Sequence, residues 1–373
     1  MNKRLIWVEG DDFTGWCCSH CTWAITAPRL ESTVAALVFA LVTAVLSAPT
    51  ALAKTPIQIY FVDVEGGQAT LAVGPSHESL LIDTGWPGFN GRDAERIVRV
   101  AKAAKIKQID YVLITHYQRD HVGGVTQLAE RMKIGEFVDH GPNLEDSDVA
   151  REDYAAYEKV IAKARHMSVR AGDGIPIKDL AVRVLTAAGE RINDPLPGAG
   201  EANPYCDSEP DAPVDATENA RSIGVLITFG RFRFIDLGDL TRKKELELAC
   251  VNHLVGRVDL YLVTHHGLDQ SNAKALVWAL HPRVAIMNNG PHKGGSPEAW
   301  QTVDDSPGLE DFWQLHYAED AGKEHNTDEE FIANSGSRDG NYIRVVAKPD
   351  GTFTVENSRN RFRKEYKALS GKD

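Results

Sequence analysis

The chain has 373 residues, of which 43% are hydrophobic and 25% charged, so it is long enough to bury a large core and its composition excludes a disordered protein. No internal repeat or low-complexity tract stands out in the sequence, which excludes a solenoid. The formal net charge of −12 repels polyanions. We therefore expect nucleic acid or anionic lipid to bind only at a locally positive site, to which bound divalent metals would contribute.

An apolar segment near the N-terminus predicts a targeting signal. Residues 33–46 read TVAALVFALVTAVL, follow Arg29, and lead into a small-x-small pattern at Ala51 and Ala53. This arrangement is typical of a secretory signal that is cleaved after Ala53. A short membrane anchor is the alternative, because the apolar stretch approaches the ~20 residues that span a bilayer. Residues 29–53 thus predict an exported protein, periplasmic or extracellular, or a membrane-anchored one if the segment is not cleaved.

Residues 1–28 form an extension of doubtful status, because a signal peptide begins near the true start of its protein. The extension contains Cys17, Cys18 and Cys21, and a C-x-x-C pair is half of a tetrahedral zinc site. No second pair follows at the spacing of a zinc ribbon, so an unrelated extension or a start codon placed too far upstream is the favoured interpretation.

Two further cysteines, Cys206 and Cys250, lie in the rest of the chain. In an oxidising compartment they can pair, but sequence alone does not bring them within the ~6 Å between Cα atoms that a disulfide needs. The sequence leaves this disulfide open.

From residue 55 onward, short apolar strands alternate with segments of helical periodicity. Two β-rich halves with helices outside predict an α+β protein, an αββα sandwich of four layers. We expect one domain over 55–358 and a basic C-terminal tail over 359–373. The connection 189–221 is rich in Pro, Gly and Asp, which predicts either a flap over the site or disorder. The predicted strands are 57–64, 69–74, 79–85, 109–115, 135–141, 180–187, 222–230, 232–238, 258–264, 283–290 and the hairpin 342–357, and the predicted helices are 92–106, 123–134, 152–167, 242–255, 272–280 and about 308–315.

Three groups of ionisable residues each follow an apolar strand, where loops carry functional side chains on a rigid scaffold. Imidazole and carboxylate together suit zinc, iron or manganese. Lone histidines such as His166 and His253 are instead expected to be structural or exposed. The strand-end groups are His116, Asp120 and His121 in THYQRDH, Asp239 in DLGD, and His265 and His266 in VTHHG.

The motif THYQRDHVGG resembles the H-x-H-x-D-H signature of the metallo-β-lactamase superfamily. Four further motifs follow the superfamily in order: FVDVEGGQATL and VTHHGLDQSN look like those of the ComEC-type hydrolase domain, LLIDTG looks like the early strand and aspartate turn, and ENARSIGVLITFGRFRFIDLGD looks like the strand that leads to the glycine-aspartate motif. The resemblance implies the αββα fold and a metal-dependent hydrolase. It leaves the substrate open, because this fold hosts many hydrolytic reactions.

The resemblance also implies a role for each matching residue. Two metal ions would share a water whose pKa they lower, and Asp120 would orient that water or accept its proton. Asp83 in IDTG is expected to be structural, stabilising the turn under the site. The implied metal ligands are His116 for the first ion, Asp120 and His121 for the second, Asp239 as the bridge, and one of His265 and His266.

Two positions depart from the superfamily. Gln118 replaces the second histidine of the signature, and Asn219 lies where many members have a later metal-binding histidine. An amide oxygen is a weaker donor than imidazole. We therefore expect one tight metal, zinc above manganese or iron, and a second position that is weak or empty. His140 at the end of EFVDHG could compensate by turning inward, although such a histidine often caps a turn.

The loop NNGPHKGG also follows a strand, and Asn289, His292 and Lys293 in it could bind the anionic part of a substrate. The leading expectation is an exported metal-dependent hydrolase of an ester, phosphodiester or amide such as a β-lactam. A small-molecule or cell-envelope substrate is favoured over nucleic acid, and no stable protein partner is expected. The alternative is a non-catalytic binding or scaffold protein of the same fold, with Gln118 as the first sign of decay.

Overall fold

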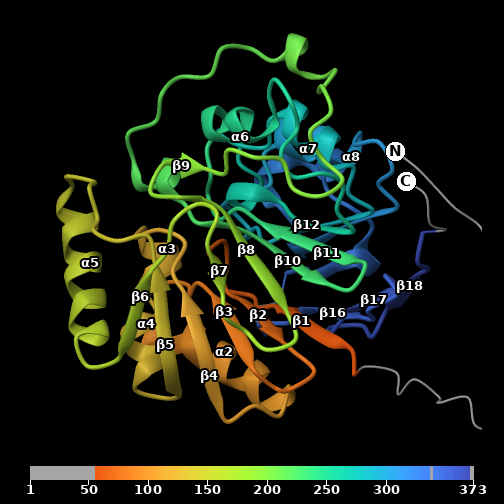
Figure 1. The fold of residues 1–373 in the computed structure, drawn as a ribbon. Helices are drawn as coiled ribbons and strands as arrows, with labels where there is room; N and C mark the ends of the chain where they lie inside the picture. The colour runs from red at the N-terminus through yellow and green to blue at the C-terminus, as the bar shows by residue number, and fades with distance from the viewer. Residues whose placement is uncertain (1–54, 337–338, 370–373) are drawn as a thin grey trace, which may run out of the picture. The chain divides into compact units, whose positions relative to one another are not determined.

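A computed structural model of the chain describes residues 55–336 and 339–369 (Figure 1). The predicted extension 1–28, with its three cysteines, and the predicted signal or anchor 29–53 lie outside the described residues. Among the residues that the structure describes, no helix is both long enough and apolar enough to cross a membrane.

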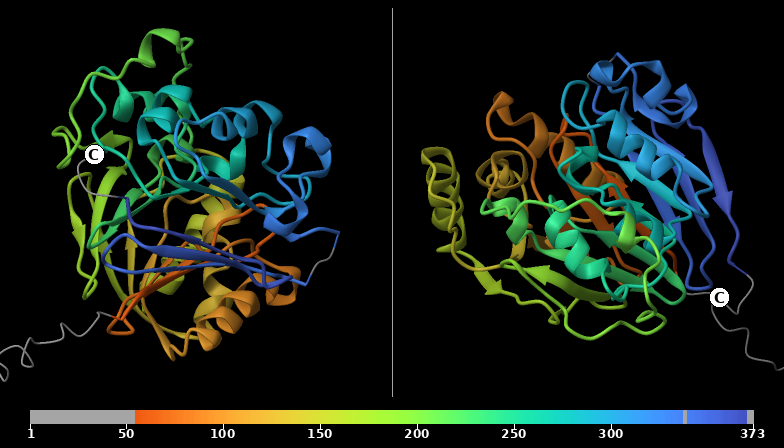
Figure 2. Two further views of the ribbon diagram at one scale, coloured as in Figure 1. Left: turned by 90° about the vertical axis from the view of Figure 1, so that its right-hand side faces the viewer. Right: turned by 90° about the horizontal axis from the view of Figure 1, so that it is seen from above.

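One nine-stranded sheet, sheet A, has the strand order β18-β17-β16-β1-β2-β3-β4-β5-β6. Its last three strands along the chain extend it from β1, and Figure 2 shows these blue strands beside the red first strand. Strands β3 to β6 are parallel, so their carboxyl ends meet at one edge. The bounds are β1 (Ile57–Phe61), β2 (Thr70–Val73), β3 (Ser79–Ile82), β4 (Gln108–Leu113), β5 (Lys133–Asp139), β6 (Arg165–Ser168), β16 (Ile343–Ala347), β17 (Phe353–Asn357) and β18 (Arg363–Tyr366).

The second nine-stranded sheet, sheet B, has the order β15-β14-β13-β12-β11-β10-β8-β7, with β9 paired to β8. Strands β11 to β15 are parallel, so a second set of carboxyl ends is gathered. The bounds are β7 (Gly174–Ile175), β8 (Ala181–Ala187), β9 (Glu190–Arg191), β10 (Gly224–Phe229), β11 (Phe232–Asp236), β12 (Leu260–Leu262), β13 (Val284–Met287), β14 (Asp311–His316) and β15 (Ile332–Asn334).

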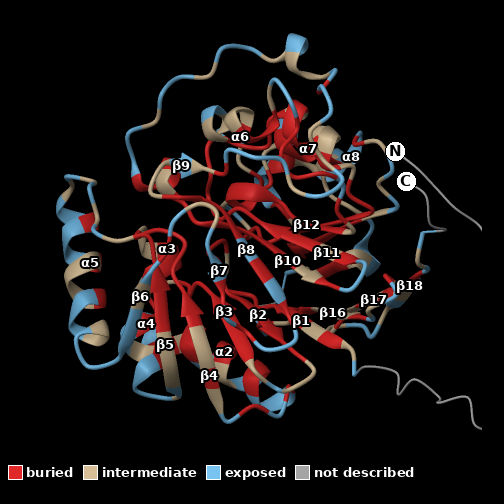
Figure 3. Cartoon of the chain, viewed as in Figure 1, coloured by how far each residue is buried: buried red, intermediate tan, exposed pale blue. Residues whose placement is uncertain are grey.

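Three apolar clusters define four layers. The largest contains alternate residues of both sheets, such as Ile59 of β1 and Ile227 of β10, and therefore lies between the sheets. A second joins the outer face of sheet A to α2, α4 and α5, and a third joins the outer face of sheet B to α6, α7 and α8. Figure 3 shows the buried residues concentrated in the strands. The αββα sandwich predicted from the sequence is thus confirmed.

Helices lie on both outer faces, and short 3₁₀ turns connect the strands. The helices over sheet A are α2 (Arg92–Ala103), α3 (Arg119–Val122), α4 (Val125–Ala129) and α5 (Asp148–Ile161), and those over sheet B are α6 (Arg242–Ala249), α7 (Lys274–Leu280) and α8 (Pro297–Asp304). The 3₁₀ turns are η1 (Phe89–Gly91), η2 (Cys206–Ser208), η3 (Glu218–Arg221), η4 (Thr264–Gly267), η5 (Glu319–Ala321), η6 (Lys323–His325) and η7 (Glu329–Phe331).

Some element predictions are wrong, and the helices predicted over 123–134 and 242–255 end early, at Ala129 and Ala249. The helix predicted over 152–167 ends at Ile161, and its last residues form the edge strand β6. The helix predicted around 308–315 is instead strand β14, because this short apolar run is buried between β13 and β15 and periodicity cannot distinguish a buried strand from a helix. Within the predicted basic tail 359–373, the structure describes strand β18 from Arg363 to Tyr366, and Tyr366 packs into the core between the sheets.

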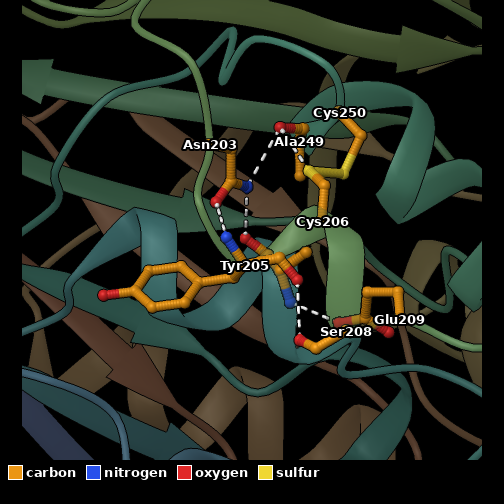
Figure 4. The surroundings of a disulfide bond; sticks show 8 residues. Asn203, Tyr205, Cys206, Ser208, Glu209, Ala249 and Cys250 are labelled. Carbon is orange, nitrogen blue, oxygen red and sulfur yellow. Dashed lines mark hydrogen bonds between the residues drawn. A yellow bond between two sulfur atoms is a disulfide. The ribbon is translucent and has the colours of Figure 1, made fainter.

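The long connection 189–221 is tied to the helices over sheet B and is not disordered there. A disulfide joins Cys206 to Cys250, with Cα atoms 5.9 Å apart (Figure 4). Next to it, the amide of Asn203 donates to the backbone oxygens of Ala249 at 3.0 Å and Ala275 at 2.8 Å. The question that the sequence left open is answered by a disulfide, and the first part of the connection packs on α6 and α7.

Candidate metal centre

The predicted site residues lie at strand ends of both sheets. His116 follows β4, and the short helix α3 after it carries Asp120 and His121. Asp239 follows β11 and the His265–His266 turn follows β12. Because β4, β11 and β12 belong to the parallel parts of their sheets, their carboxyl ends bring these side chains together.

Four side chains form a compact cluster. The ligand atoms of Asp120, His121, Asp239 and His266 all lie within 4.8 Å of one another, and all four residues are buried. His121 Nε2 lies 3.1 Å from Asp239 Oδ2 and 3.4 Å from Asp120 Oδ2. His266 Nε2 lies 3.2 Å from Asp120 Oδ2. Two imidazoles and two carboxylates around one point are a donor set that binds divalent metals.

The two remaining predicted histidines flank Asp239. His265 Nε2 lies 3.3 Å and His116 Nε2 3.9 Å from Asp239 Oδ2. His265 and His266 have φ angles of 55° and 56°, in the left-handed region that side chains other than glycine rarely adopt. This strained turn brings both neighbouring imidazoles to one carboxylate, and strain of this kind is concentrated at functional sites.

The unpaired atoms of the site fit a bound metal. Within the described residues, His116 Nε2 and both carboxylate oxygens of Asp239 are buried and have no hydrogen-bond partner. Buried polar atoms are almost always paired. The opposite nitrogens of the rings are held: His116 Nδ1 lies 3.1 Å from Thr115 Oγ1, and His265 Nδ1 lies 3.1 Å from Ser271 Oγ. Metal-binding histidines are typically oriented in this way through their second nitrogen.

Asp83 orients His121, consistent with the supporting role expected for it. Its Oδ2 lies 2.7 Å from His121 Nδ1 and accepts the Thr115 hydroxyl at 2.7 Å, while its Oδ1 accepts the Thr115 amide at 2.8 Å. Asp83 is fully buried, so these contacts are not exchanged with solvent. The ring of His121 is thereby held with Nε2 toward Asp120 and Asp239.

The cluster strongly shifts the pKa values of its own groups. Burial alone would lower the pKa of His121, but Asp239, Asp120 and Asp83 around it raise that pKa well above its ordinary value. Burial would raise the pKa of Asp120, yet the charges of His121 and Lys293 hold it well below its usual range. A divalent cation that binds here must therefore displace a proton from His121.

Of the three substrate-binding candidates, only Lys293 reaches the cluster. Its ammonium contacts Asp120 Oδ2 and lies 4.9 Å from the centre of the Trp86 ring. Asn289 is fully buried and holds the backbone of His316 with its amide, donating at 2.8 Å. His292 is largely exposed and faces acidic side chains on the surface. Lys293 therefore lies at the edge of the site, whereas Asn289 is structural and His292 lies outside it.

The three residues expected to be weak ligands have different surroundings. Gln118 precedes α3, is half-buried, and does not cap the helix with its side chain. Asn219, in η3, is buried, and its Oδ1 has no hydrogen-bond partner among the described residues. His140 is not part of the four-residue cluster and places its Nε2 3.0 Å from Glu218 Oε2.

Sequence reasoning missed two supporting carboxylates. Asp236 accepts from the amide of Gln68 at 3.0 Å and from the backbone of Gly238 at 3.0 Å, and burial raises its pKa to about 7. Glu218 is fully buried beside His140. A carboxylate within an apolar stretch, as in FIDLG, was the available signal for Asp236. For Glu218, in a polar loop, the sequence holds none.

Comparisons with known proteins agree with this geometry. Residues 62–209 match the family model described as the metallo-beta-lactamase superfamily. The chain is 25% identical over 253 residues to ComE operon protein 3 of Bacillus subtilis (strain 168), covering 62% of this chain and 28% of that protein. It is 23% identical over 241 residues to Recombination protein 2 of Haemophilus influenzae, covering 64% of this chain and 25% of that protein.

The chain thus spans about a quarter of the length of these curated relatives. Among solved structures, the metallo-beta-lactamase fold protein YhfI from Bacillus subtilis is similar, with 11% identity, a TM-score of 0.41, and coverage of 69% of this chain and 95% of that one. The family match and the curated relatives confirm the resemblance drawn from the motifs: residues 62–209 match the metallo-beta-lactamase superfamily, and the chain is similar to two ComEC-type proteins at low identity.

Proposed function

We propose that the protein is a metal-dependent hydrolase that cleaves an ester, phosphodiester or amide bond with an activated water. The observation that carries this proposal is the buried cluster of Asp120, His121, Asp239 and His266, whose ligand atoms lie within 4.8 Å of one another. A decayed site would not retain two buried carboxylates and two buried imidazoles in contact, because buried charged groups are costly without a function or a partner.

The chain's own residues have distinct parts in this chemistry. Asp120, His121, Asp239 and His266 would hold the tightly bound ion, with His265 and His116 beside Asp239. When bound, a divalent cation supplies Lewis acidity and lowers the pKa of the attacking water. Zinc suits this mixture of imidazole and carboxylate best, and manganese or iron are the alternatives. Asp120 is the proposed general base, since its carboxylate borders both the cluster and the exposed edge marked by Lys293.

The surroundings favour a small or cell-envelope substrate that carries a negative charge. The Lys293 side chain is 31% exposed and its ammonium contacts Asp120, so we propose that it pairs with an anionic group of the substrate at the edge of the cluster. The net charge of −12 disfavours long nucleic acid by long-range repulsion. A phosphodiester or a carboxylate-bearing amide satisfies both conditions.

Export is part of the proposal. The apolar segment within residues 29–53 motivates it, and the Cys206–Cys250 disulfide supports it because structural disulfides persist in oxidising compartments. Cell fractionation with an antibody against the protein tests this part. Recovery in the reducing cytoplasm, with both thiols free to alkylation, would overturn it.

Turnover assays test the hydrolase itself. The purified protein, supplied with Zn²⁺ or Mn²⁺, should hydrolyse at least one of a phosphodiester, a lactone or a β-lactam model substrate, and His121→Ala should abolish this. His77→Asn is the matched control, because His77 is exposed in the β2–β3 turn and asparagine tolerates its positive φ. Metal-independent turnover, or none on any substrate, would contradict the proposal and favour a binding or scaffold protein.

A further inference from the structure

A buried histidine–carboxylate pair lies one strand away from the metal cluster. His140 directly follows β5, which runs parallel to β4 with Leu113 opposite Val138. The pairing continues past the strand, because the backbone amide of Ile114 donates to the oxygen of Val138 at 2.9 Å. His140 and His116 therefore follow neighbouring strand ends at the same edge of sheet A.

The carboxylate fixes the orientation and tautomer of His140. Glu218 is fully buried and places Oε2 3.0 Å from His140 Nε2. Its other oxygen accepts the backbone amide of Leu144 at 3.2 Å and lies 3.2 Å from Arg221 Nε. A carboxylate that is already paired with a cation accepts hydrogen bonds and does not donate them, so His140 Nε2 carries the proton. In the neutral ring, Nδ1 is then a lone-pair acceptor.

No described residue donates a hydrogen bond to this Nδ1 atom of His140. His140 is 5% exposed, and its Nδ1 has no hydrogen-bond partner among the residues that the structure describes. A protonated ring would be worse, because it would bury an N–H without an acceptor. An imidazole that is held by a carboxylate through one nitrogen and bare at the other is the arrangement of a metal ligand.

Two more buried polar atoms lack a hydrogen-bond partner, one just after β4 and one in the turn η3. His116 Nε2 and Asn219 Oδ1 are also buried and unpaired within the described chain. Asn219 follows Glu218 directly in η3, and Ser222 at the end of this turn places its Oγ 3.4 Å from His116 Nδ1. The turn η3 therefore reaches both strand ends, through Glu218 at His140 after β5 and Ser222 at His116 after β4, and each of the three elements carries one buried polar atom without a hydrogen-bond partner among the described residues.

Two other histidines show that neither an unpaired nitrogen nor a carboxylate partner is enough by itself to indicate a metal site. His253 Nδ1 is also buried and unpaired, but its Nε2 faces a backbone oxygen, that of Gly256 at 3.3 Å. His166 is held by a carboxylate, Asp139, at 2.7 Å, but it is partly exposed on the edge strand β6. Among the histidines that the structure describes, only His140 combines a buried carboxylate partner, a nitrogen without a hydrogen bond and a place at the strand end next to that of His116.

We propose that His140 Nδ1, His116 Nε2 and Asn219 Oδ1 bind a second divalent cation, and that Glu218 orients His140 for this role. The inference rests on the proposed function, in that it completes the same metal centre. An imidazole from β5 here replaces the one that Gln118 lacks. The set is neutral, so it binds its cation more weakly than the cluster that contains Asp120 and Asp239.

Metal titration tests the proposal without any substrate. Zn²⁺ binding to the purified, chelator-treated full-length protein is measured by competition with a chromophoric chelator. The wild type should bind two equivalents of unequal affinity. His140→Ala should bind the tight equivalent only, and Glu218→Gln should weaken the second equivalent about 10- to 100-fold. His253→Ala, which removes a buried imidazole with an unpaired nitrogen that lies outside the proposed ligand set, should retain both. A Zn²⁺ equivalent held at Cys17 to Cys21 is distinguished by a Cys18→Ser, Cys21→Ser variant, which should also retain both.

Retention of the tight equivalent shows that each variant is folded. If His140→Ala does not fold, His140→Gln serves instead, because its amide can still donate to Glu218 but offers no imidazole. Two equivalents of unchanged affinity in these variants, or a wild type that binds only one, would overturn the proposal. A protein that binds two equivalents, loses one with His140 and hydrolyses no substrate would support it while contradicting the hydrolase.

Discussion

The two halves of the candidate metal centre differ in charge. On one side, Asp120, His121, Asp239 and His266 neutralise one another through contacts of 3.1 to 3.4 Å. On the other side, the His116, Asn219 and His140 donor atoms are neutral, buried and unpaired. We call these the charged half and the neutral half.

This difference in charge determines how each half would bind a cation. The charged half attracts a cation strongly, but binding has to displace the proton that its carboxylates hold on His121. The neutral half has no proton to release on Nδ1 of His140, and it gains only the donation of two imidazoles and an amide. We therefore expect the charged half to bind its cation tightly and the neutral half to bind its cation weakly.

The largest effect is expected where the charged half is broken. His121→Ala removes the imidazole that contacts both Asp120 and Asp239 and leaves Asp239 without its nearest imidazole. We expect loss of the tight metal and a fall in kcat/KM of at least about 10³-fold, about 4 kcal/mol of transition-state stabilisation. Steady-state kinetics with saturating metal measure this. Turnover at the level of the His77→Asn control would show that the charged half is not the catalytic one.

We expect the free energy of unfolding to depend on pH through Glu245, a buried carboxylate that contacts the segment after the His265–His266 turn. Glu245 accepts the backbone amides of Asn272 at 3.0 Å and Ala273 at 2.8 Å, just after the His265–His266 turn. Burial raises its pKa from 4.5 to about 7, although these amides partly offset the shift. Because the folded state holds this proton more tightly, its contribution is complete below pH 4.5 and is lost as the pH rises to 7. The loss amounts to about 3 kcal/mol.

Urea unfolding at several pH values in the presence of a chelator measures this contribution. Asp120 and Asp239 have lowered pKa values and act in the opposite direction, whereas Asp236 has a raised pKa and acts in the same direction, so the difference between the wild type and Glu245→Gln is the readout. This difference should change by about 3 kcal/mol between pH 4.5 and 7.5. A difference that is independent of pH would show that Glu245 titrates normally.

A smaller effect is expected from the support of His121. Asp83→Asn keeps an acceptor for the backbone of Thr115 but places an amide where His121 Nδ1 needs a carboxylate. We expect the affinity for the tight metal to fall about 10- to 100-fold, with the weaker equivalent unchanged. Chelator competition on both equivalents separates the two halves. An equal loss of affinity for both metal equivalents would contradict the expectation that the two halves bind their cations independently.

The smallest effect is expected from restoring the residue that the superfamily signature has. Gln118→His restores an imidazole two residues after His116 in place of a weakly donating amide. The weaker equivalent should bind about tenfold more tightly, about 1.4 kcal/mol, and turnover should rise if that position takes part. An unchanged second equivalent would show that His140 already occupies the role and that position 118 faces elsewhere.

The fold was largely predictable, and the reason is visible in particular elements. Strands such as Ile57–Phe61 alternate between the core between the sheets and the outer face, so their period is read directly. The segment Asp311–His316 was mistaken for a helix because a strand that is buried on both faces has no alternation. For the site, the motif order predicted Asp120, His121 and Asp239 and left open which of His265 and His266 takes part, and the structure places His266 in the cluster.

The neutral half shows where sequence reasoning stops. The sequence indicates only that His140 could turn inward. It gives no signal that Glu218 is its partner, because Glu218 lies 78 positions further along the chain. No local pattern links two such residues. Asn289 and His292 were grouped with Lys293 because they share one loop, yet only Lys293 reaches Asp120. Neighbours in a loop point in different directions, and only backbone geometry decides which.

By itself, the sequence determined the sandwich, the strand ends that carry the candidate metal ligands, and the absence of an imidazole at positions 118 and 219. These features follow from periodicity and residue type, which are local. Only the tertiary structure decided that Cys206 pairs with Cys250, that Asp83 holds His121, and that a carboxylate of η3 orients His140 at the end of β5. Those contacts depend on how separate elements pack, because hydrogen bonds and lone pairs are satisfied in space and not along the chain.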